Sequence, residues 1–162
     1  MTILDTLDRI GKTTQVKTKA ITEHSVLNEA YDYEKPSSFS RGLRIDLDNL
    51  VILLISGTAS IDEQGQTVHI GDFDAQLRRT YHNITGLLAA EGATWKDVVR
   101  TTCYLRDIER DYEAFNRGRT EFFREQGLDP LPASTGIQAI LCRPELLVEI
   151  EAIAMFIPKP KE

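Results

Sequence analysis

The chain has 162 residues, of which 41% are hydrophobic and 27% charged, and its formal net charge at pH 7 is −6. This size and composition predict one soluble globular domain with its own hydrophobic core. The acidic balance, without a block of lysine and arginine, argues against a nucleic-acid partner. No apolar run approaches the roughly 20 residues that span a bilayer, so a membrane partner is not expected either.

The cysteines and histidines predict neither a metal site nor a disulfide framework. Cys103 and Cys142 have no metal-binding or redox spacing, and the three histidines are scattered along the chain. The sequence also lacks the motifs of phosphate loops, dinucleotide-binding folds and hydrolase elbows. We therefore expect no cofactor. The cysteine usage and a start without the pattern of a secretion signal favour a cytoplasmic location.

The predicted elements start with an N-terminal lead-in, residues 1–38. Residues 1–15 fit a short helix that Gly11 would end, and residues 15–21 fit an edge strand. Residues 22–38 are polar and predict an irregular loop.

Two strands are predicted next. Residues 39–45 indicate a strand, and a turn at 46–49 follows it. Residues 50–56 are a continuous apolar run, which is typical of a strand buried on both faces. We expect this strand to break at Gly57, because glycine weakens the interior of a strand.

The clearest predicted element is a helix that follows Gly71. Its apolar residues have the spacing of one helical face: Leu77, Tyr81, Ile84, Leu87 and Leu88. Asp72 is the expected N-cap and Gly92 the expected stop. The β-branched run at residues 98–105 then predicts a strand.

A second helix is expected after that strand, capped by Asp111 and stopped by Gly127. The residues near one of its faces are Tyr112, Phe115, Arg119, Phe122 and Phe123. This helix and the first one have apolar faces, which predicts that both pack on a sheet.

The last long stretch, residues 132–157, predicts two extended segments joined by a polar turn around Arg143. Residues 147–157 alternate, so that Glu149 and Glu151 share one face. A strand this apolar is expected in the centre of a sheet, where a carboxylate needs a partner, solvent or a function. The order ββ-α-β-α-ββ indicates an α+β domain, with two helices on one face of a mixed sheet.

On the residues alone, the candidate chemistry is limited to a cleft with glutamate and arginine. Cys142 is a candidate nucleophile, but no histidine lies near it in the sequence, and a lone cysteine at a strand end is typically a small buried hydrophobe. Asn116 and Arg119 lie one helical turn apart, a spacing that an ordinary exposed helix face also produces.

A set of short motifs in a fixed order resembles the YjgF/RidA family. The residues that carry it are Ser56-Gly57, Gly71-Asp72, Gln76, Asn83, Asp97-Val98-Val99, Thr102, Tyr104-Leu105, Asp107, Asn116, Phe122-Phe123, Pro132-Ala133 and Val148 to Ala154. They place a RidA-like domain at residues 39–158, followed by a tail at 159–162. The resemblance implies a chorismate-mutase-like fold, in which a homotrimer forms a central barrel from its sheets, with helices outside and clefts between subunits.

The resemblance also implies an activity, because family members typically hydrolyse reactive enamine and imine acids to 2-oxo acids and ammonia. Their central arginine stands in a Pro-Ala-Arg-Ser motif, and this chain has Ser134 in its place. In the family's Pro-Tyr-Ser-Gln motif, Phe39 replaces the tyrosine and Arg41 the glutamine. Arg41, Arg119 or Arg143 could supply the missing guanidinium, which binds a carboxylate through two hydrogen bonds.

Residues 55–61 and 142–149 resemble a second group, the C-terminal half of chorismatases, which hydrolyse or rearrange chorismate. This resemblance maps a cysteine and a proton-donating glutamate of those enzymes to Cys142 and Glu149. The chemistry is coherent, because protonation of an enol ether needs a carboxylic acid whose pKa is raised by burial. Chorismatases are much longer chains, however, and their first half contributes to the pocket.

The prediction is therefore a RidA-like homotrimer whose intersubunit clefts act on a small anionic, carboxylate-bearing molecule. Glu149 is the predicted acid/base, and Cys142 is the second catalytic candidate. The predicted substrate-binding residues are Arg41, Gly57, Thr58, Ala59, Asn116, Arg119, Ser134, Thr135 and Arg143. Hydrolysis of an enamine, imine or enol-ether acid is the first interpretation. The alternatives are a ligand-binding or regulatory trimer without turnover, and chorismatase-like activity on chorismate.

Overall fold

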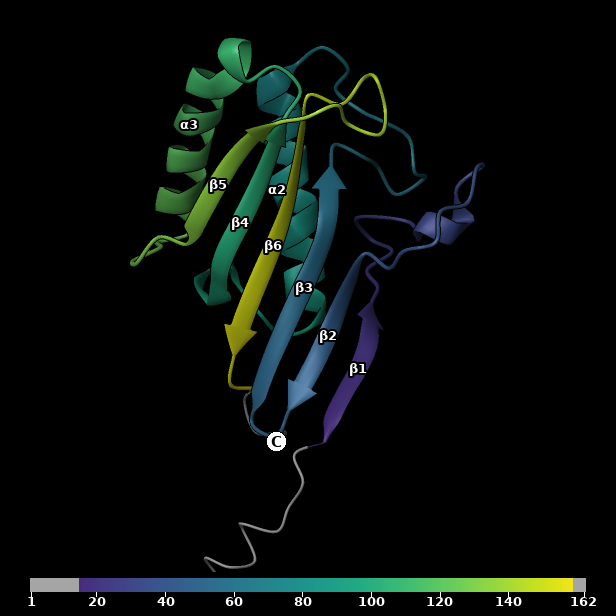
Figure 1. Ribbon diagram of the computed structural model, residues 1–162, viewed down its shortest axis with the longest axis vertical. Coiled ribbons are helices and arrows are strands. Elements are labelled where there is room, and N and C mark those ends of the chain that lie inside the picture. The colour runs from purple at the N-terminus through teal and green to yellow at the C-terminus, as the bar shows by residue number, and fades with distance from the viewer. Residues whose placement is uncertain (1–14, 159–162) are drawn as a thin grey trace, which may run out of the picture.

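The computed structural model describes residues 15–158, which form one six-stranded mixed sheet with two long helices on one face (Figure 1). The elements are β1 Val16–Ile21, the 3-10 helix η1 Ala30–Asp32, β2 Gly42–Leu47, β3 Leu50–Ala59, α2 Phe73–Ala90, the 3-10 helix η2 Trp95–Asp97, β4 Val98–Leu105, α3 Ile108–Glu125, β5 Ala133–Gln138 and β6 Val148–Phe156. This order confirms the predicted α+β arrangement, and β1 is the predicted edge strand. The helix predicted to end at Gly11 and the tail at 159–162 lie outside the described residues.

β6 lies in the middle of the sheet, as the alternation of its residues predicted. The strand order is β1-β2-β3-β6-β4-β5, in which β4 and β5 run parallel and all other neighbours antiparallel. The last two extended segments, β5 and β6, are therefore not neighbours, because β4 lies between them. The turn that joins them crosses the end of the sheet (Figure 1), and this crossing places Arg143 beside the end of β3.

The core lies between the helices and the sheet. Alternate residues of β6 are at most 2% exposed and face α2: Val148, Ile150, Ala152 and Ala154. The predicted apolar face of α2 is buried against them, and each large aliphatic side chain stabilises the fold by about 1.5–3 kcal/mol. The predicted helix ends are also confirmed. Asp72 accepts a hydrogen bond from the backbone of Ala75, and Gly92 has a φ of +76°.

The opposite face of the sheet is apolar, and no element within residues 15–158 covers it. It carries Leu43, Ile45, Ile52, Leu54, Ile153 and Met155 in facing positions of β2, β3 and β6. Leu54 and Met155 are each 39% exposed. Within residues 15–158, β3 is therefore buried on one face, and burial of its other face by neighbouring subunits stays a prediction.

The predicted break of β3 at Gly57 does not occur, because the strand continues to Ala59. A β-bulge between Ile55 and Thr58 keeps the strand paired with β6 through this point. Glycine is needed at this position because the side chain of Glu149, from the neighbouring strand, lies directly against it and leaves no room for a Cβ atom. The glycine is therefore a packing requirement of the sheet and not its end.

Two predicted element starts are corrected by the structure. β2 starts at Gly42, later than Phe39, because Gly42 is the first residue that pairs with both neighbouring strands. α3 starts before Asp111, because the side chain of Asp107 accepts a hydrogen bond of 3.0 Å from the backbone of Arg110 and caps the helix. Among residues 15–158, no helix combines the length and the apolar character that a membrane span requires.

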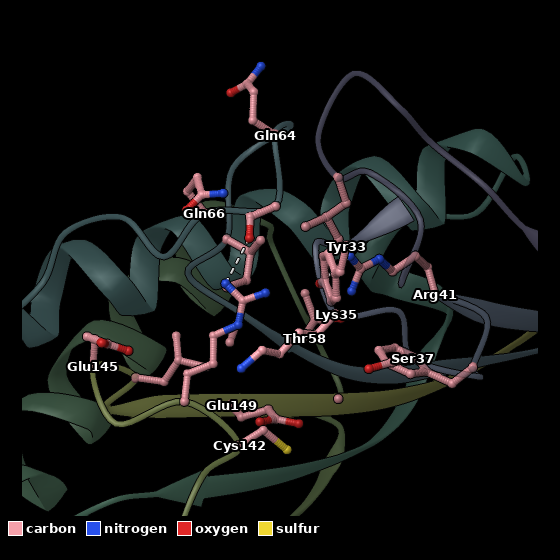
Figure 2. Close-up of a pocket in the computed structure, with 18 of the residues that line it drawn as sticks. Tyr33, Lys35, Ser37, Arg41, Thr58, Gln64, Gln66, Cys142, Glu145 and Glu149 are labelled. Carbon is pink, nitrogen blue, oxygen red and sulfur yellow. Dashed lines mark hydrogen bonds between the residues drawn. The ribbon is translucent and has the colours of Figure 1, made fainter. Parts of the chain in front are cut away.

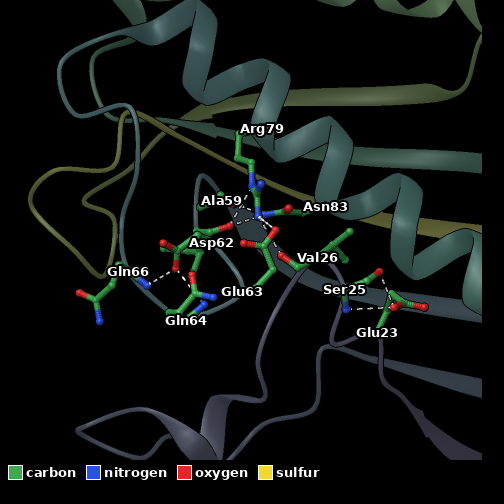
Figure 3. Close-up of polar contacts among 11 residues, drawn as sticks. Glu23, Ser25, Val26, Ala59, Asp62, Glu63, Gln64, Gln66, Arg79 and Asn83 are labelled. Atoms are coloured by element: carbon green, nitrogen blue, oxygen red, sulfur yellow. Dashed lines mark hydrogen bonds and ion pairs between the residues drawn. The ribbon is translucent and has the colours of Figure 1, made fainter.

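The lead-in is irregular apart from η1, as predicted, but it is packed into the fold. Val26 and Leu27 are 5% and 1% exposed. Gly86 of α2 makes room for Val26, whose Cγ1 would lie 2.7 Å from an added Cβ. Arg79 of α2 donates to the carbonyl of Val26 at 3.0 Å and pairs with Glu63 at 2.9 Å (Figure 3). One helix thus fixes both the lead-in and the loop that follows β3.

Candidate active site

A cavity of about 680 Å³ lies where β3 ends and β6 begins (Figure 2). Its walls come from the lead-in, the end of β3, the loop around Gly65 and the turn before β6. These segments meet because β3 and β6 are antiparallel, with Ala59 opposite Glu149. Of the residues predicted for the site, the cavity brings together Arg41, Gly57, Thr58, Ala59, Cys142, Arg143 and Glu149.

Glu149 extends from β6 into this cavity (Figure 2). Its half-buried side chain lies against Gly57, where an added Cβ would overlap with Oε1 and lie 3.0 Å from Cδ. Burial, and to a lesser degree the charge of Glu151, raises the pKa of Glu149 above the usual glutamate value. Glu149 therefore keeps its proton to a higher pH than an exposed glutamate does, which suits a general acid.

Glu151 shares a sheet face with Glu149 but has different surroundings. It stands opposite Thr102 of β4 and is not one of the described residues that line the cavity. Burial, together with the charge of Glu151, raises the pKa of Tyr104, which stands opposite Glu149. The two glutamates are therefore not equivalent, because only Glu149 lies in the cavity.

Arg143 presents unused hydrogen-bond donors to the cavity. Its Nη1 donates to the carbonyl of Gly65 at 2.8 Å and to Oγ1 of Thr67 at 3.4 Å, which fixes the side chain. Its Nε and Nη2 have no hydrogen-bond partner within residues 15–158. Arg143 is therefore the guanidinium of this cavity that is best placed to bind an anion.

Arg41 is more fully used inside the protein. Its Nε donates to the carbonyl of Asn28 at 2.7 Å, and its Nη2 donates to the hydroxyl of Tyr33. Arg41 as a whole is 4% exposed, and the Cζ of its guanidinium lies 5.0 Å from the centre of the Tyr33 ring. Arg41 thus supports the wall of the cavity and offers fewer donors to a ligand than Arg143 does.

The remaining predicted residues form a second group, on α3 and the edge strand β5, away from the cavity. Arg119 donates from Nη1 to Oγ of Ser134 at 3.3 Å and from Nη2 to Oδ1 of Asn116 at 2.6 Å. Thr135 accepts a hydrogen bond of 3.1 Å from Arg100. An arginine from α3 thus reaches Ser134, the position at which the resemblance implied an arginine.

Sequence reasoning missed the contribution of the lead-in to the cavity. Tyr33, Lys35 and Ser37 line it, although they lie in a stretch whose polar composition indicated only a loop. The thiol of Cys142 also lines the cavity, and no histidine does so among the described residues. Within residues 15–158, no group of histidine, cysteine, aspartate and glutamate is arranged to hold a metal ion.

Residues 34–156 match the family model described as endoribonuclease L-PSP, which is the model of the YjgF/RidA family. The chain belongs to the YjgF/RidA family. The match covers both groups of candidate residues and starts within the lead-in, after Leu27 and Tyr33 of the cavity.

Relatives with known names agree with this assignment to the YjgF/RidA family. The chain is 36% identical over 107 residues to the 3-aminoacrylate deaminase RutC of Acinetobacter baylyi, a match that covers 66% of this chain and 79% of that protein. It is 33% identical over 102 residues to a RutC family protein of Pyrococcus horikoshii, covering 63% and 77%.

Solved structures of YjgF-like proteins share the fold. The YjgF gene product of E. coli superposes with a TM-score of 0.66 at 26% identity, covering 84% of this chain and 97% of that one. TdcF of E. coli, solved with bound serine, superposes with a TM-score of 0.69 at 22% identity, covering 87% and 99%. The mixed sheet with two helices on one face is therefore the fold of this family.

Replacement of Gly57 by alanine is expected to lower activity by at least about tenfold, because the new methyl group displaces the carboxyl of Glu149 from its place in the cavity. Steady-state kinetics with an enamine or imine acid measures the effect. Activity of Gly57→Ala equal to that of the wild type would contradict the importance of the Glu149 position.

Proposed function

We propose that the protein is a deaminase-like hydrolase of a small enamine or imine acid, and that it works as a homotrimer. The observation that carries the proposal is the arrangement of Glu149, an acid with a raised pKa, and Arg143, a guanidinium with unused donors, in one cavity. The similarity to a 3-aminoacrylate deaminase supports this reaction class. The formal net charge of −6 favours a small molecule over RNA as the substrate.

The apolar face of the sheet supports the trimer. Within residues 15–158, the side chains of Leu54 and Met155 are exposed there, and the neighbouring apolar residues of β2, β3 and β6 are partly buried. Burying an apolar face of this kind is the usual driving force for association. In our proposal three copies pack these faces together, as the family resemblance implies.

A trimer would bring the cavity residues around Glu149 and the residues on α3 and β5 into one site. β5 is exposed along its whole length, so Ser134 and Thr135 are available to a neighbouring subunit. We propose that the α3–β5 group of one subunit completes the cavity of the next. Arg119 then holds the carboxylate beside the reacting carbon, in the role that the family's missing arginine would have.

Glu149 carries the proton transfers in this proposal. Its carboxyl group protonates the enamine carbon, which converts the C=C–NH2 unit to an iminium ion. The carboxylate then takes a proton from the water that attacks the C=N carbon, and the neutral carbinolamine forms. A proton from Glu149 converts the amine to a leaving group, the C–N bond breaks, and the hydroxyl proton returns to Glu149. The products are the oxo acid and ammonia, and Glu149 regains its starting state.

The direct test is ammonia release from enamine and imine acids generated in the assay. 2-Aminoacrylate, 2-iminobutyrate and 3-aminoacrylate hydrolyse in buffer, and the protein is expected to accelerate at least one of them in proportion to its concentration. Absence of acceleration with all three would overturn the deaminase-like function and leave the ligand-binding trimer, which the replacement of the family arginine by Ser134 already favours.

Chorismatase-like activity is a second candidate, because Cys142 and Glu149 both line the cavity. The same acid could protonate the enol ether of chorismate, whose two carboxylates would face Arg143 and Lys35. Chorismate consumption followed by its ultraviolet absorbance measures this. A rate that is equal in the protein and in Glu149→Gln would exclude Glu149 as the proton donor.

A further inference from the structure

One wall of the cavity comes from the lead-in, part of which precedes the match to the family model. The family match begins at residue 34, whereas Leu27 and Tyr33 line the cavity and Lys35 follows directly after the start of the match. The lead-in therefore contributes to the shape and the charge of the site.

This wall is fixed by contacts with the rest of the domain. Val26 and Leu27 are buried under α2, and the carbonyl of Val26 accepts a hydrogen bond from Arg79 (Figure 3). The carbonyl of Asn28 accepts one from Arg41 at 2.7 Å. A wall held from both sides can present side chains to a ligand in a set geometry.

The wall places cationic groups close to the ring of Tyr33. The ring of Tyr33 has two guanidinium groups over it, with the Cζ of Arg41 at 5.0 Å and the Cζ of Arg143 at 4.9 Å from the ring centre. Arg143 keeps Nε and Nη2 for a ligand. Lys35 lines the same cavity, and its ammonium group has no ion-pair or hydrogen-bond partner within residues 15–158. Glu34 and Glu145 also line the cavity, but within residues 15–158 no ion pair joins either of them to Lys35 or Arg143.

The cavity has room for more than a three-carbon acid. Its volume of about 680 Å³ lies within the range of about 300–1,000 Å³ that holds drug-sized ligands. A short enamine acid held by one arginine beside Glu149 would leave the Lys35 ammonium and the Nε and Nη2 donors of Arg143 without a ligand partner.

We propose that the wall formed by Tyr33, Lys35 and Arg143 binds a second acidic group of the substrate, so that the substrates are dicarboxylic enamine or imine acids. The inference rests on the proposed function for the reacting end, where Glu149 transfers protons and Arg119 holds the first carboxylate. The second carboxylate lies against Nε and Nη2 of Arg143 and the ammonium of Lys35. The lead-in is then the part of the chain that sets substrate specificity.

The test is a calorimetric titration of the full-length protein with two stable 2-oxo acids of equal carbon number. 2-Oxoglutarate has a second carboxylate, and 2-oxopentanoate has a methyl group in its place. The protein is expected to bind 2-oxoglutarate at least about tenfold more tightly, because charge-assisted hydrogen bonds add this much affinity. Lys35→Met is expected to remove most of this preference and to change the affinity for 2-oxopentanoate less than about twofold, and Arg143→Met is also expected to remove most of the preference. A fold defect would instead weaken both acids equally. Lys96→Met is the matched control, because Lys96 is an exposed residue of η2 away from the cavity and loses the same charge.

Equal affinity for the two acids, a preference that survives in both cavity variants, or no binding of either acid at millimolar concentration would overturn the inference. The proposed function can fail separately. Ammonia release with equal affinity for both acids keeps the function and overturns the dicarboxylate class. Preferential binding of 2-oxoglutarate without ammonia release from any imine acid keeps the anion-binding wall and overturns the deaminase-like function.

Discussion

Replacement of Glu149 by glutamine is expected to lower kcat for ammonia release by about 100-fold or more, because a positioned acid/base typically contributes about 10²–10⁴-fold. Glutamine keeps the size of the side chain and its contact with Gly57, but its amide can neither donate a proton as an acid nor accept one as a carboxylate does. Glu151→Gln is the matched control on the same strand face and is expected to keep kcat within about twofold. Similar losses in both variants would show that the charge of the sheet face, and not Glu149 itself, supports activity.

The pH dependence gives this prediction a second readout. The pKa of Glu149 is raised, so the protonated acid persists above the usual glutamate value of 4.5 and the wild-type rate falls as the pH rises through the raised pKa. Folding stability has the same sign. The stability from the protonated carboxyl is fully present below the ordinary pKa and is lost as the pH rises through the folded pKa. The Tm measured by thermal unfolding is therefore expected to fall less for Glu149→Gln than for the wild type when the pH is raised from about 4 to about 8.

Replacement of Arg119 by methionine is expected to lower kcat/KM by about 100-fold, mainly by raising KM, because removal of one partner from a desolvated charge pair costs about 2–5 kcal/mol. The guanidinium that Ser134 and Asn116 hold in place is lost with this change. Arg119→Lys keeps the charge but not the two-pronged geometry, and an intermediate KM is expected.

Arg117→Met is the control for Arg119. Arg117 lies on the same helix, and its 58% exposed side chain pairs with Asp74 at 3.5 Å, so its loss removes the same charge from outside the site. A KM for Arg119→Met that equals the KM of this control would show that Arg119 does not bind the substrate carboxylate.

Much of the fold was predictable because its signals are local. The ends of α2 are set by the side chain of Asp72 and the left-handed backbone of Gly92, both visible in the sequence. The bounds of β4 follow from a run of β-branched residues. α3 was predicted to start at Asp111 because that residue is also a good cap. The structure shows that Asp107 caps the helix and that Asp111 is buried within it.

The sequence predictions are wrong or incomplete where contacts between residues far apart in the sequence determine the structure. Gly57 indicated the end of a strand, but it lies inside β3 because Glu149 from another strand fills the space beside it. The placement of Glu149 in a cavity followed from a family resemblance and not from periodicity. The roles of Tyr33 and Lys35 had no local signal, because their position beside Arg143 depends on how the lead-in packs under α2.

The sequence left three candidates for the arginine near Ser134, namely Arg41, Arg119 and Arg143. In the structure, Arg119 is the one of the three that contacts it. Arg41 is held by Asn28 and Tyr33, and Arg143 is held by the loop at Gly65. Arg119 reaches Ser134 because α3 packs beside β5. No spacing rule predicts this contact, since residues 119 and 134 lie on different elements of the fold.

The central claim is that Glu149 of one subunit and Arg119 of its neighbour serve the same cleft. It is tested by denaturing the inactive variants Glu149→Gln and Arg119→Met together and refolding the mixture at equal amounts. The account predicts recovery of about a quarter of the wild-type ammonia release, because each cleft draws one residue from each of two randomly assorted subunits. A mixture that remains as inactive as the separate variants, while light scattering shows intact trimers, would contradict a site shared between subunits.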